Sequence, residues 1–107
     1  MRFVPPESAI QIIWEIQSKP DRISEFERRY GPEGEWACLF RQSSGFRETL
    51  LAADIETPGR YLVTDIWTDL AAFHNFREEF SQQYQALDRA CESLTMSEKP
   101  LGIFQYP

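Results

Sequence analysis

Apolar and polar positions alternate along residues 9–17, AIQIIWEIQ, and this period of two is typical of a β-strand. One side of the strand is apolar and carries Ile10, Ile12, Trp14 and Ile16. The other side is mixed and carries Gln11, Ile13 and Glu15. The segment is therefore predicted to be a strand that buries one face.

The period changes to three and four after this strand. Ile23, Phe26 and Tyr30 fall on one stripe of a helix predicted within residues 18–31, with Ser18 as its cap and Gly31 at its end. The apolar segment WACLFRQ, residues 36–42, is predicted to form one or two further helical turns.

Two extended segments follow, residues 46–54 and 60–67, and the Pro58-Gly59 pair between them is a strong turn signal. They are predicted to form a hairpin. One face of the second strand is predicted to carry Tyr61, Val63, Asp65 and Trp67.

The clearest periodic signal is an apolar stripe on a long amphipathic helix predicted from Asp69 to Leu94, with Thr68 or Asp69 as its cap. No Pro or Gly interrupts it. The stripe consists of Phe73, Phe76, Phe80, Tyr84, Leu87, Cys91 and Leu94. A last strand is predicted around residues 101–106.

The order of these elements predicts an α+β, ferredoxin-like βαββαβ fold, with a four-stranded antiparallel sheet and both helices on one sheet face. The opposite face is predicted to be mixed and to be covered by a second copy of the chain. Its predicted residues are Gln11, Ile13, Glu15, Tyr61, Val63, Asp65 and Trp67.

Composition excludes several classes of function. The 107 residues favour one domain over residues 1–107, and the formal net charge of −6 disfavours nucleic acid as a partner. No apolar run approaches the roughly 18 residues of a membrane span. Residues 1–10 show no export signal, and Cys38 and Cys91 lack metal or redox spacing, so a cytoplasmic protein with reduced thiols is expected.

A few side chains are candidates for chemistry. Asp65 and Glu15 are expected on the same mixed face, where two close carboxylates form an acid/base pair or are neutralised by Arg47 or Arg60. The lone histidine, His74, suits a base or an exposed helical position. Two phenols that can orient a substrate hydroxyl come from Tyr30 and Tyr61. No Cys/His cluster or Gly-rich phosphate loop is present in the sequence, so no metal site is predicted.

Residues 45–94 resemble the antibiotic-biosynthesis-monooxygenase-like (ABM) proteins of the dimeric α/β barrel superfamily. The resemblance rests on the Gly45-Phe46 strand start, the hairpin, the strand ending in Trp67, and the helix that opens with an acidic residue and aromatics. It implies a homodimer paired through the sheets, with a pocket between sheet and helices. Some members oxygenate phenolic or quinone-like aromatics without a cofactor.

The same resemblance bears on individual residues. Trp67 matches a tryptophan that lies in the pocket of catalytic relatives, although a tryptophan here also suits packing between sheet and helix. Haem-degrading relatives carry a histidine well down the helix, whereas QQYQALDRA, residues 82–90, contains none. Their first-strand asparagine also has no match in residues 9–17, so haem degradation is not expected.

The resulting hypothesis is a homodimeric small-molecule-binding protein that resembles cofactor-independent monooxygenases acting on planar aromatic or quinol-type compounds. The predicted catalytic residues are Trp67, Asp65 and His74. The predicted substrate contacts are Tyr61, Glu15, Ile13 and Phe73. The alternatives are a non-enzymatic dimerisation or binding module and a partner within a larger assembly.

Overall fold

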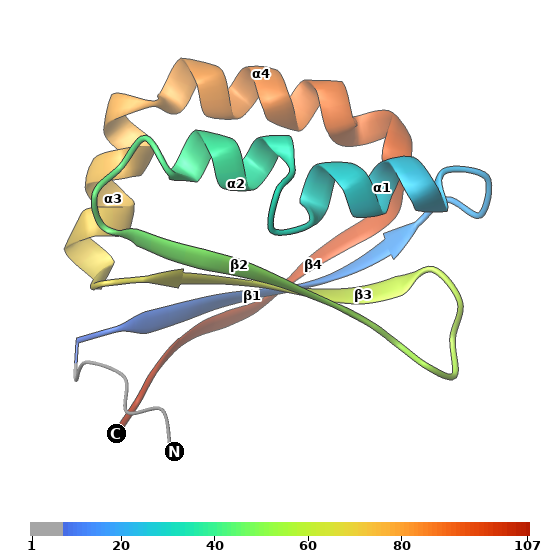
Figure 1. The fold of residues 1–107 in the computed structure, drawn as a ribbon, viewed down its shortest axis with the longest axis horizontal. Coiled ribbons are helices and arrows are strands. Elements are labelled where there is room, and N and C mark those ends of the chain that lie inside the picture. The colour runs from blue at the N-terminus through green and yellow to red at the C-terminus, as the bar shows by residue number, and fades with distance from the viewer. Residues whose placement is uncertain (1–7) are drawn as a thin grey trace.

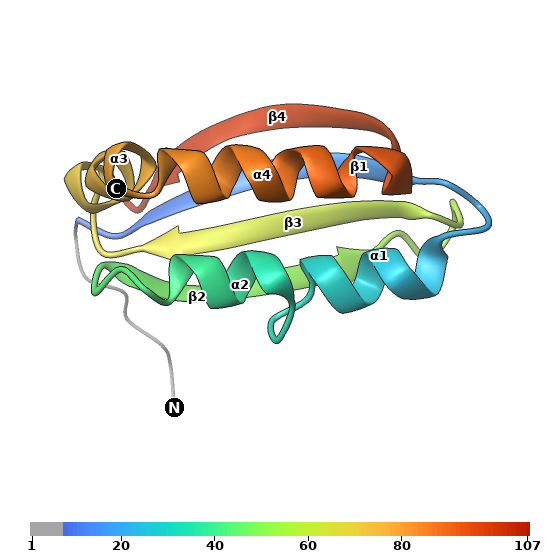
Figure 2. The same ribbon diagram turned by 90° about the horizontal axis from the view of Figure 1, so that it is seen from above.

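The computed structural model describes residues 8–107, so the predicted lack of an export signal in residues 1–10 falls mainly outside the described residues. The elements follow in the order β1 (Ile10–Ser18), α1 (Ile23–Tyr30), α2 (Glu35–Phe40), β2 (Phe46–Ala53), β3 (Arg60–Trp67), α3 (Leu70–Glu79), α4 (Ser81–Cys91), a 3-10 turn (Glu92–Leu94) and β4 (Thr95–Gln105). The antiparallel sheet has the strand order β2-β3-β1-β4. All the helices lie on one face of it (Figures 1 and 2), and the predicted ferredoxin-like fold is confirmed.

The pairing of β1 with β3 decides which side chains face the helices. Ile10 pairs with Trp67 and Ile12 pairs with Asp65. Directly paired residues point to the same side of a sheet, so these side chains share the helix-covered face. The prediction that Tyr61, Val63, Asp65 and Trp67 lie on the opposite face, together with Gln11, Ile13 and Glu15, is therefore wrong. Alternation along β1 and β3 was predicted correctly, but alternation alone does not fix the pairing between two strands.

The sheet face away from the helices is here called the open face. As predicted, it carries Gln11, Ile13 and Glu15 of β1. Their neighbours on β3 are Leu62, Thr64 and Ile66, which were not predicted to lie there. Three large apolar side chains remain exposed there: Leu50 at 47%, Leu62 at 41% and Phe104 at 47%.

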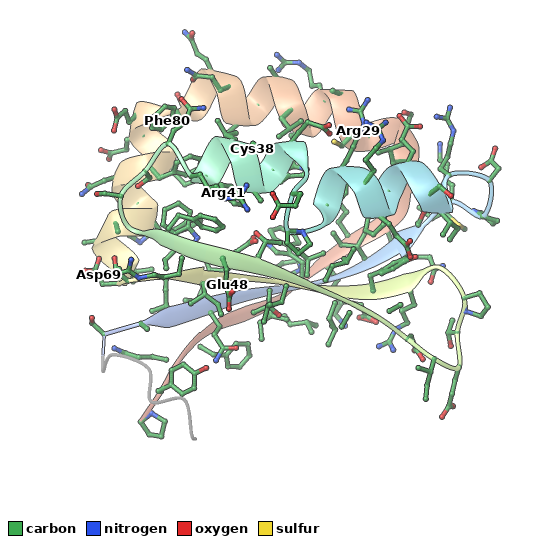
Figure 3. The ribbon with its side chains drawn as sticks, in the orientation of Figure 1. Arg29, Cys38, Arg41, Glu48, Asp69 and Phe80 are labelled. Carbon is green, nitrogen blue, oxygen red and sulfur yellow. The ribbon has the colours of Figure 1, made fainter. Side chains whose placement is uncertain are left out.

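The long helix predicted from Asp69 to Leu94 is interrupted at Phe80. This residue has φ −109° and ψ 26°, which ends α3 and lets α4 set off in a new direction (Figures 1 and 3). The predicted cap is confirmed, because the Asp69 carboxylate accepts a hydrogen bond of 2.7 Å from the amide of Ala72. Consequently α3 lies at the end of the sheet and α4 runs along it (Figure 1).

Trp67 lies at the centre of an aromatic cluster between the sheet and the helices. Its side chain is 0% exposed, and its ring lies 5.2–5.6 Å, centroid to centroid, from four rings. These are the rings of Phe40, Phe46, Phe73 and Phe76. A β-carbon at Gly45 would come within 2.3 Å of Ala72 Cβ, so only glycine permits this close approach between the start of β2 and α3.

Two element boundaries differ from the sequence prediction. Ser18 ends β1 and is buried, and α1 begins at Ile23 with no side-chain cap. The last strand begins at Thr95, six residues before its predicted start. It is an edge strand with a register irregularity opposite Ile13 and Trp14, and this allows Pro100 inside it, since an edge position needs no amide hydrogen bond. The extension brings Glu98 against the helices.

Candidate functional site

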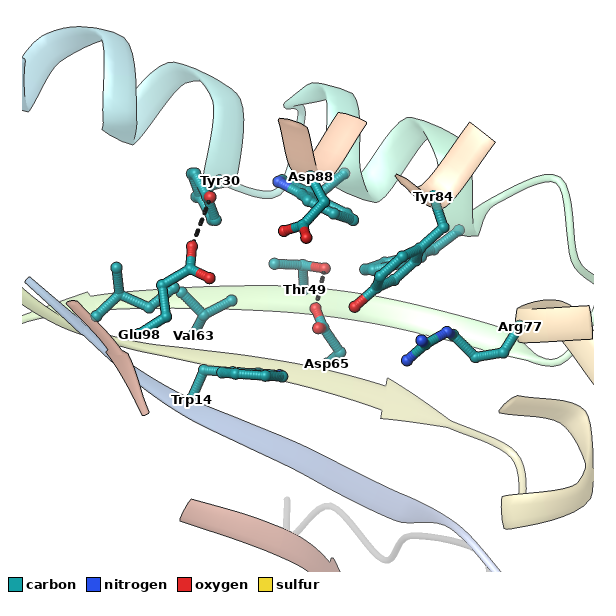
Figure 4. Close-up of a pocket in the computed structure, with 12 residues that line it drawn as sticks. Trp14, Tyr30, Thr49, Val63, Asp65, Arg77, Tyr84, Asp88 and Glu98 are labelled. Atoms are coloured by element: carbon teal, nitrogen blue, oxygen red, sulfur yellow. Dashed lines mark hydrogen bonds between the residues drawn. The ribbon is translucent and has the colours of Figure 1, made fainter. Parts of the chain in front are cut away.

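A pocket of about 300 Å³ opens between the sheet and the helices (Figure 4). It takes one or two side chains from every strand and every helix. Its walls are formed by Trp14, Ile16, Tyr30, Trp36, Phe40, Thr49, Val63, Asp65, Arg77, Tyr84, Asp88 and Glu98. The volume is at the lower end of the range usual for small-molecule sites.

Asp65 is the most unusual side chain of this pocket. It stands on the central strand β3, faces the helices and is only 8% exposed. Burial raises its pKa to about 6, because removing a carboxylate from water disfavours the charged form. The Thr49 hydroxyl donates a hydrogen bond of 2.7 Å to Asp65 Oδ1 and acts in the opposite direction on the pKa. Asp65 is thus a carboxylate whose protonation changes close to neutral pH.

A second polar pair lies at the β4 side of the pocket. The Tyr30 hydroxyl donates a hydrogen bond of 3.1 Å to Glu98 Oε1 (Figure 4). Burial raises the pKa of Tyr30, and the Glu98 carboxylate raises it further, so this phenol stays protonated. Burial also raises the pKa of Glu98, against the effect of the Tyr30 hydrogen bond.

The α3–α4 side of the pocket is formed by Tyr84 and Arg77. The guanidinium carbon of Arg77 lies 4.0 Å from the centre of the Tyr84 ring, which is a close cation–π contact. Burial raises the pKa of Tyr84, and the charge of Arg77 opposes that rise. The Trp36 ring meets Tyr84 edge-on at 5.0 Å. A planar ligand would therefore meet several aromatic walls.

Of the predicted catalytic residues, Asp65 lines the pocket. Trp67 lies on the same face of the sheet as Asp65, but its side chain packs in the aromatic cluster and does not line the pocket. Phe40 lies between the pocket and this cluster. His74 is exposed on α3 and meets the ring of its neighbour Phe73 at 5.9 Å.

The predicted substrate contacts lie outside the pocket lining. Tyr61 packs against Phe26, with the two ring centres 4.7 Å apart. Burial raises the pKa of Tyr61 to about 12, and the 2.6 Å hydrogen bond that its hydroxyl donates to Glu27 acts in the same direction. Phe73 packs on Trp67 in the aromatic cluster, whereas Ile13 lies on the open face.

The predicted pairing of Asp65 with Glu15 is wrong, because the two side chains point to opposite faces of the sheet. Glu15 instead forms an ion pair of 2.6 Å with Arg60, as one of the sequence alternatives proposed. For Asp65 that alternative fails, since its partner is Thr49.

Several lining residues were not predicted as site residues. Thr49, Asp88 and Glu98 carried no readable signal, because the strand FRETLLAA shows no regular alternation and the other two residues look like surface charges. Tyr30 was predicted to orient a substrate and does line the pocket.

Within residues 8–107, no group of three or more His, Cys, Asp and Glu side chains is arranged to hold a metal ion. Over the same residues, no helix has the length and apolar character needed to cross a membrane.

Comparison with known proteins adds to this picture. The sequence profile of the family described as antibiotic biosynthesis monooxygenase matches residues 9–87. A search of curated protein sequences gave no match.

Several solved structures have the same fold. The Pseudomonas aeruginosa protein PA3566 is 17% identical, with a TM-score of 0.67 over 94% of this chain and 95% of its own. SnoaB of Streptomyces nogalater, described as a cofactor-independent oxygenase, is 18% identical, with a TM-score of 0.64 over 94% of each chain. A putative antibiotic biosynthesis monooxygenase of Bacteroides thetaiotaomicron is 15% identical, with a TM-score of 0.67 over 94% and 90% of the two chains.

Proposed function

Because the chain belongs to the antibiotic biosynthesis monooxygenase family, we propose that it binds a small planar aromatic or quinol-type compound in the Asp65 pocket and oxygenates it without a cofactor. The observation that carries this proposal is the buried carboxylate of Asp65 within a pocket of about 300 Å³. A base whose pKa lies near the working pH is mostly ionised there and still accepts protons readily. The description of SnoaB as a cofactor-independent oxygenase supports the choice of reaction.

The proposed reaction needs only the substrate and molecular oxygen. Asp65 removes a proton from an activated ring CH₂ group, and the resulting carbanion supplies the electrons that reduce oxygen. One oxygen atom becomes a carbonyl on that carbon, and the other leaves as water with the two hydrogens, so CH₂ and O₂ give C=O and H₂O. The role of the protein is to supply the base and to exclude bulk water with its aromatic walls.

Asp65 is the proposed catalytic base, and Thr49 is a positioning residue that fixes its carboxylate through the 2.7 Å hydrogen bond. The catalytic roles of Trp67 and His74 stay predictions. So do the substrate contacts of Tyr61, Glu15, Ile13 and Phe73, and the reaction proposed above needs none of them.

A homodimer formed through the open face is part of this proposal. The exposed Leu50, Leu62 and Phe104 support it, because large apolar side chains gathered on one sheet face are costly to leave in water. The sequence-based expectation that Tyr61 and Trp67 meet the partner does not survive, since the helices of the same chain cover both. A cytoplasmic location is also proposed, and it is supported by Cys38 and Cys91, which are both free thiols.

The alternative of a non-enzymatic module with a filled interior is disfavoured by the volume of the pocket. The deciding experiment supplies anthrone to the purified protein in air and measures anthraquinone over the uncatalysed rate, with ¹⁸O₂ to trace the new carbonyl oxygen. Wild type is expected to exceed the uncatalysed rate, and Asp65→Asn is expected to lose at least about tenfold. Glu56→Gln, an exposed change in the β2–β3 turn, is the control. Equal rates for wild type and buffer would refute the enzymatic proposal.

A further inference from the structure

The charges around the pocket are unbalanced. Its lining contains the three carboxylates of Asp65, Asp88 and Glu98 against the single guanidinium of Arg77. Figure 4 shows these carboxyl groups turned toward the same space. Carboxylates brought close together repel one another and favour an added positive charge.

Apart from Arg77, no positively charged side chain of residues 8–107 lines the pocket. The ion pairs of these residues join Arg22, Arg28, Arg29, Arg41 and Arg60 to Glu15, Glu25, Glu33, Glu35 and Asp54, none of which lines the pocket. The hydrogen-bond partners of Asp65 and Glu98 are the neutral hydroxyls of Thr49 and Tyr30. Asp65, at 8% exposure, is thus a buried carboxylate that no positive side chain accompanies.

The one cation of the lining contacts an aromatic wall of the same pocket. Arg77 is exposed, its guanidinium carbon lies 4.0 Å from the centre of the Tyr84 ring, and it forms no ion pair with Asp65. This contact also shows that an aromatic wall of the pocket accepts a cation on its face.

The remaining walls suit a flat ring. Trp14, Tyr30, Trp36, Phe40 and Tyr84 surround the same space as the carboxylates. Aromatic side chains bind other rings by stacking or edge contacts and bind ammonium groups through their faces. A cavity of about 300 Å³ has room for a small aromatic ligand with a short side chain.

We infer that the ligand of this pocket is a protonated arylalkylamine, with its ring against the aromatic walls and its ammonium group toward the carboxylates of Asp65, Asp88 and Glu98. The inference rests on the proposed function for the location of the site, and it narrows the ligand class from planar aromatics to aromatic amines. Aromatic acids and phosphate esters are excluded by the same charges. The net charge of −6 on the whole chain adds a field that attracts cations and repels anions.

The test uses three probes that share one phenol ring and differ in charge: tyramine as the cation, 4-ethylphenol as the neutral compound and 3-(4-hydroxyphenyl)propionate as the anion. Isothermal titration calorimetry at pH 7.5 and low salt gives the affinities. Tyramine is expected to bind at least about tenfold more tightly than 4-ethylphenol, and the anion at least about tenfold more weakly. Quenching of tryptophan fluorescence reports the same event, since Trp14 and Trp36 line the pocket.

Two conservative variants locate the ammonium group. Asp88→Asn and Glu98→Gln each remove one negative charge and keep a polar side chain of nearly the same size, so neither change is expected to disturb folding. Each is expected to reduce the preference for tyramine about threefold to tenfold and to leave the affinity for 4-ethylphenol unchanged. Glu56→Gln removes the same charge outside the pocket and is expected to leave the preference intact.

The outcomes separate the two proposals. If 4-ethylphenol binds and tyramine binds no more tightly, the amine inference fails while the pocket remains a binding site. If none of the three probes binds, the amine inference fails as well, and the anthrone assay alone judges the proposed oxygenation. If Glu56→Gln lowers the preference as much as Glu98→Gln, the effect comes from net charge and the assignment to this pocket is overturned.

Discussion

The Thr49 hydroxyl donates a hydrogen bond of 2.7 Å to the carboxylate of Asp65, from the edge strand β2 to the central strand β3. Both side chains are buried, Thr49 at 2% and Asp65 at 8% exposure. The Thr49 hydroxyl favours the charged form of the Asp65 carboxylate, whereas the burial of Asp65 disfavours it. The pH dependence of both folding and function is expected to follow from this balance.

The first prediction concerns the stability of Asp65→Asn. The native state keeps the Asp65 proton up to about pH 6, whereas the unfolded chain releases it near the ordinary pKa of 3.8. Wild type is therefore expected to lose stability as the pH rises through this window. Since Asn does not titrate, the advantage of Asp65→Asn is expected to grow to about 3 kcal/mol by pH 7.

Urea denaturation of both proteins at pH 4, 5, 6 and 7 checks this expectation. Glu56→Gln is the matched control, because its side chain is exposed, and its curve is expected to parallel that of wild type. Parallel curves for Asp65→Asn and wild type would mean that Asp65 titrates normally in the folded protein.

A second prediction separates the effect of the Thr49 hydrogen bond on the pKa of Asp65 from the effect of burial. Thr49→Val has nearly the same shape but lacks the donor that favours the ionised carboxylate. The pKa of Asp65 is expected to rise above its value of about 6, and stability at pH 7 is expected to fall by about 1–3 kcal/mol.

An NMR titration of the Asp65 side-chain carboxyl carbon measures the first effect directly. Thr49→Ser keeps the hydroxyl and is expected to keep the pKa near that of wild type. A lower pKa in Thr49→Val would show that the hydroxyl does not stabilise the carboxylate.

The third prediction is the pH profile of anthrone oxygenation. If Asp65 is the base, the rate is expected to rise with pH and to level off above a midpoint at about 6, because only the ionised carboxylate accepts the proton. In Thr49→Val the midpoint is expected to move upward, and in Asp65→Asn the rising limb is expected to disappear.

Glu98 needs a control in this experiment, because burial raises the pKa of its carboxyl too. In Glu98→Gln the midpoint is expected to stay where wild type has it. A midpoint that vanishes in Glu98→Gln and persists in Asp65→Asn would transfer the role of base to Glu98.

The fourth prediction addresses the homodimer. Leu62→Glu places a charge in the centre of the open face, where Leu62 is 41% exposed, and burying that charge against a second copy is unfavourable. Multi-angle light scattering is expected to show a dimer for wild type and for Leu62→Met, and a monomer for Leu62→Glu. A wild type that runs as a monomer at micromolar concentration would remove the dimer from the proposed function.

The fifth prediction tests how α3 is anchored. Asp69→Ala removes the cap that accepts the amide hydrogen of Ala72, and it is expected to cost about 1 kcal/mol of stability in urea denaturation. Asp69→Asn retains a capping oxygen and is expected to lose much less. Equal losses in the two variants would indicate that the charge at the helix start matters more than the hydrogen bond.

Much of the fold could be predicted from periodicity, because β1, β3 and the helices each turn one regular set of apolar side chains toward the core. The stripe through Phe73, Phe76 and Tyr84 identified the helical region, and the Pro58-Gly59 pair identified the turn of the hairpin. The break at Phe80 was not predictable in this way, because no Pro or Gly marks it and the apolar stripe continues across it.

The site was predicted only in part. Asp65 and Tyr30 were chosen by residue type, and both line the pocket. The error about Tyr61 and Trp67 arose because alternation says which residues share a face and leaves open which face it is. The place of Glu98 in the pocket could not be predicted, because β4 begins earlier than its composition indicates. The place of Asp88 depends on the direction that α4 takes after the break at Phe80.

Phe40 lines the pocket and also meets the Trp67 ring at 5.6 Å, and it is the one lining residue in ring contact with that tryptophan among the described residues. Its side chain therefore separates the pocket from the packed aromatic cluster around Trp67. A shorter side chain at this position would extend the pocket toward Trp67 and admit longer ligands, but it would lower the stability of the folded protein. A single position on α2 thus sets the length of the ligand that the protein accepts, and it can be changed without altering the carboxylates that select for a positively charged ligand.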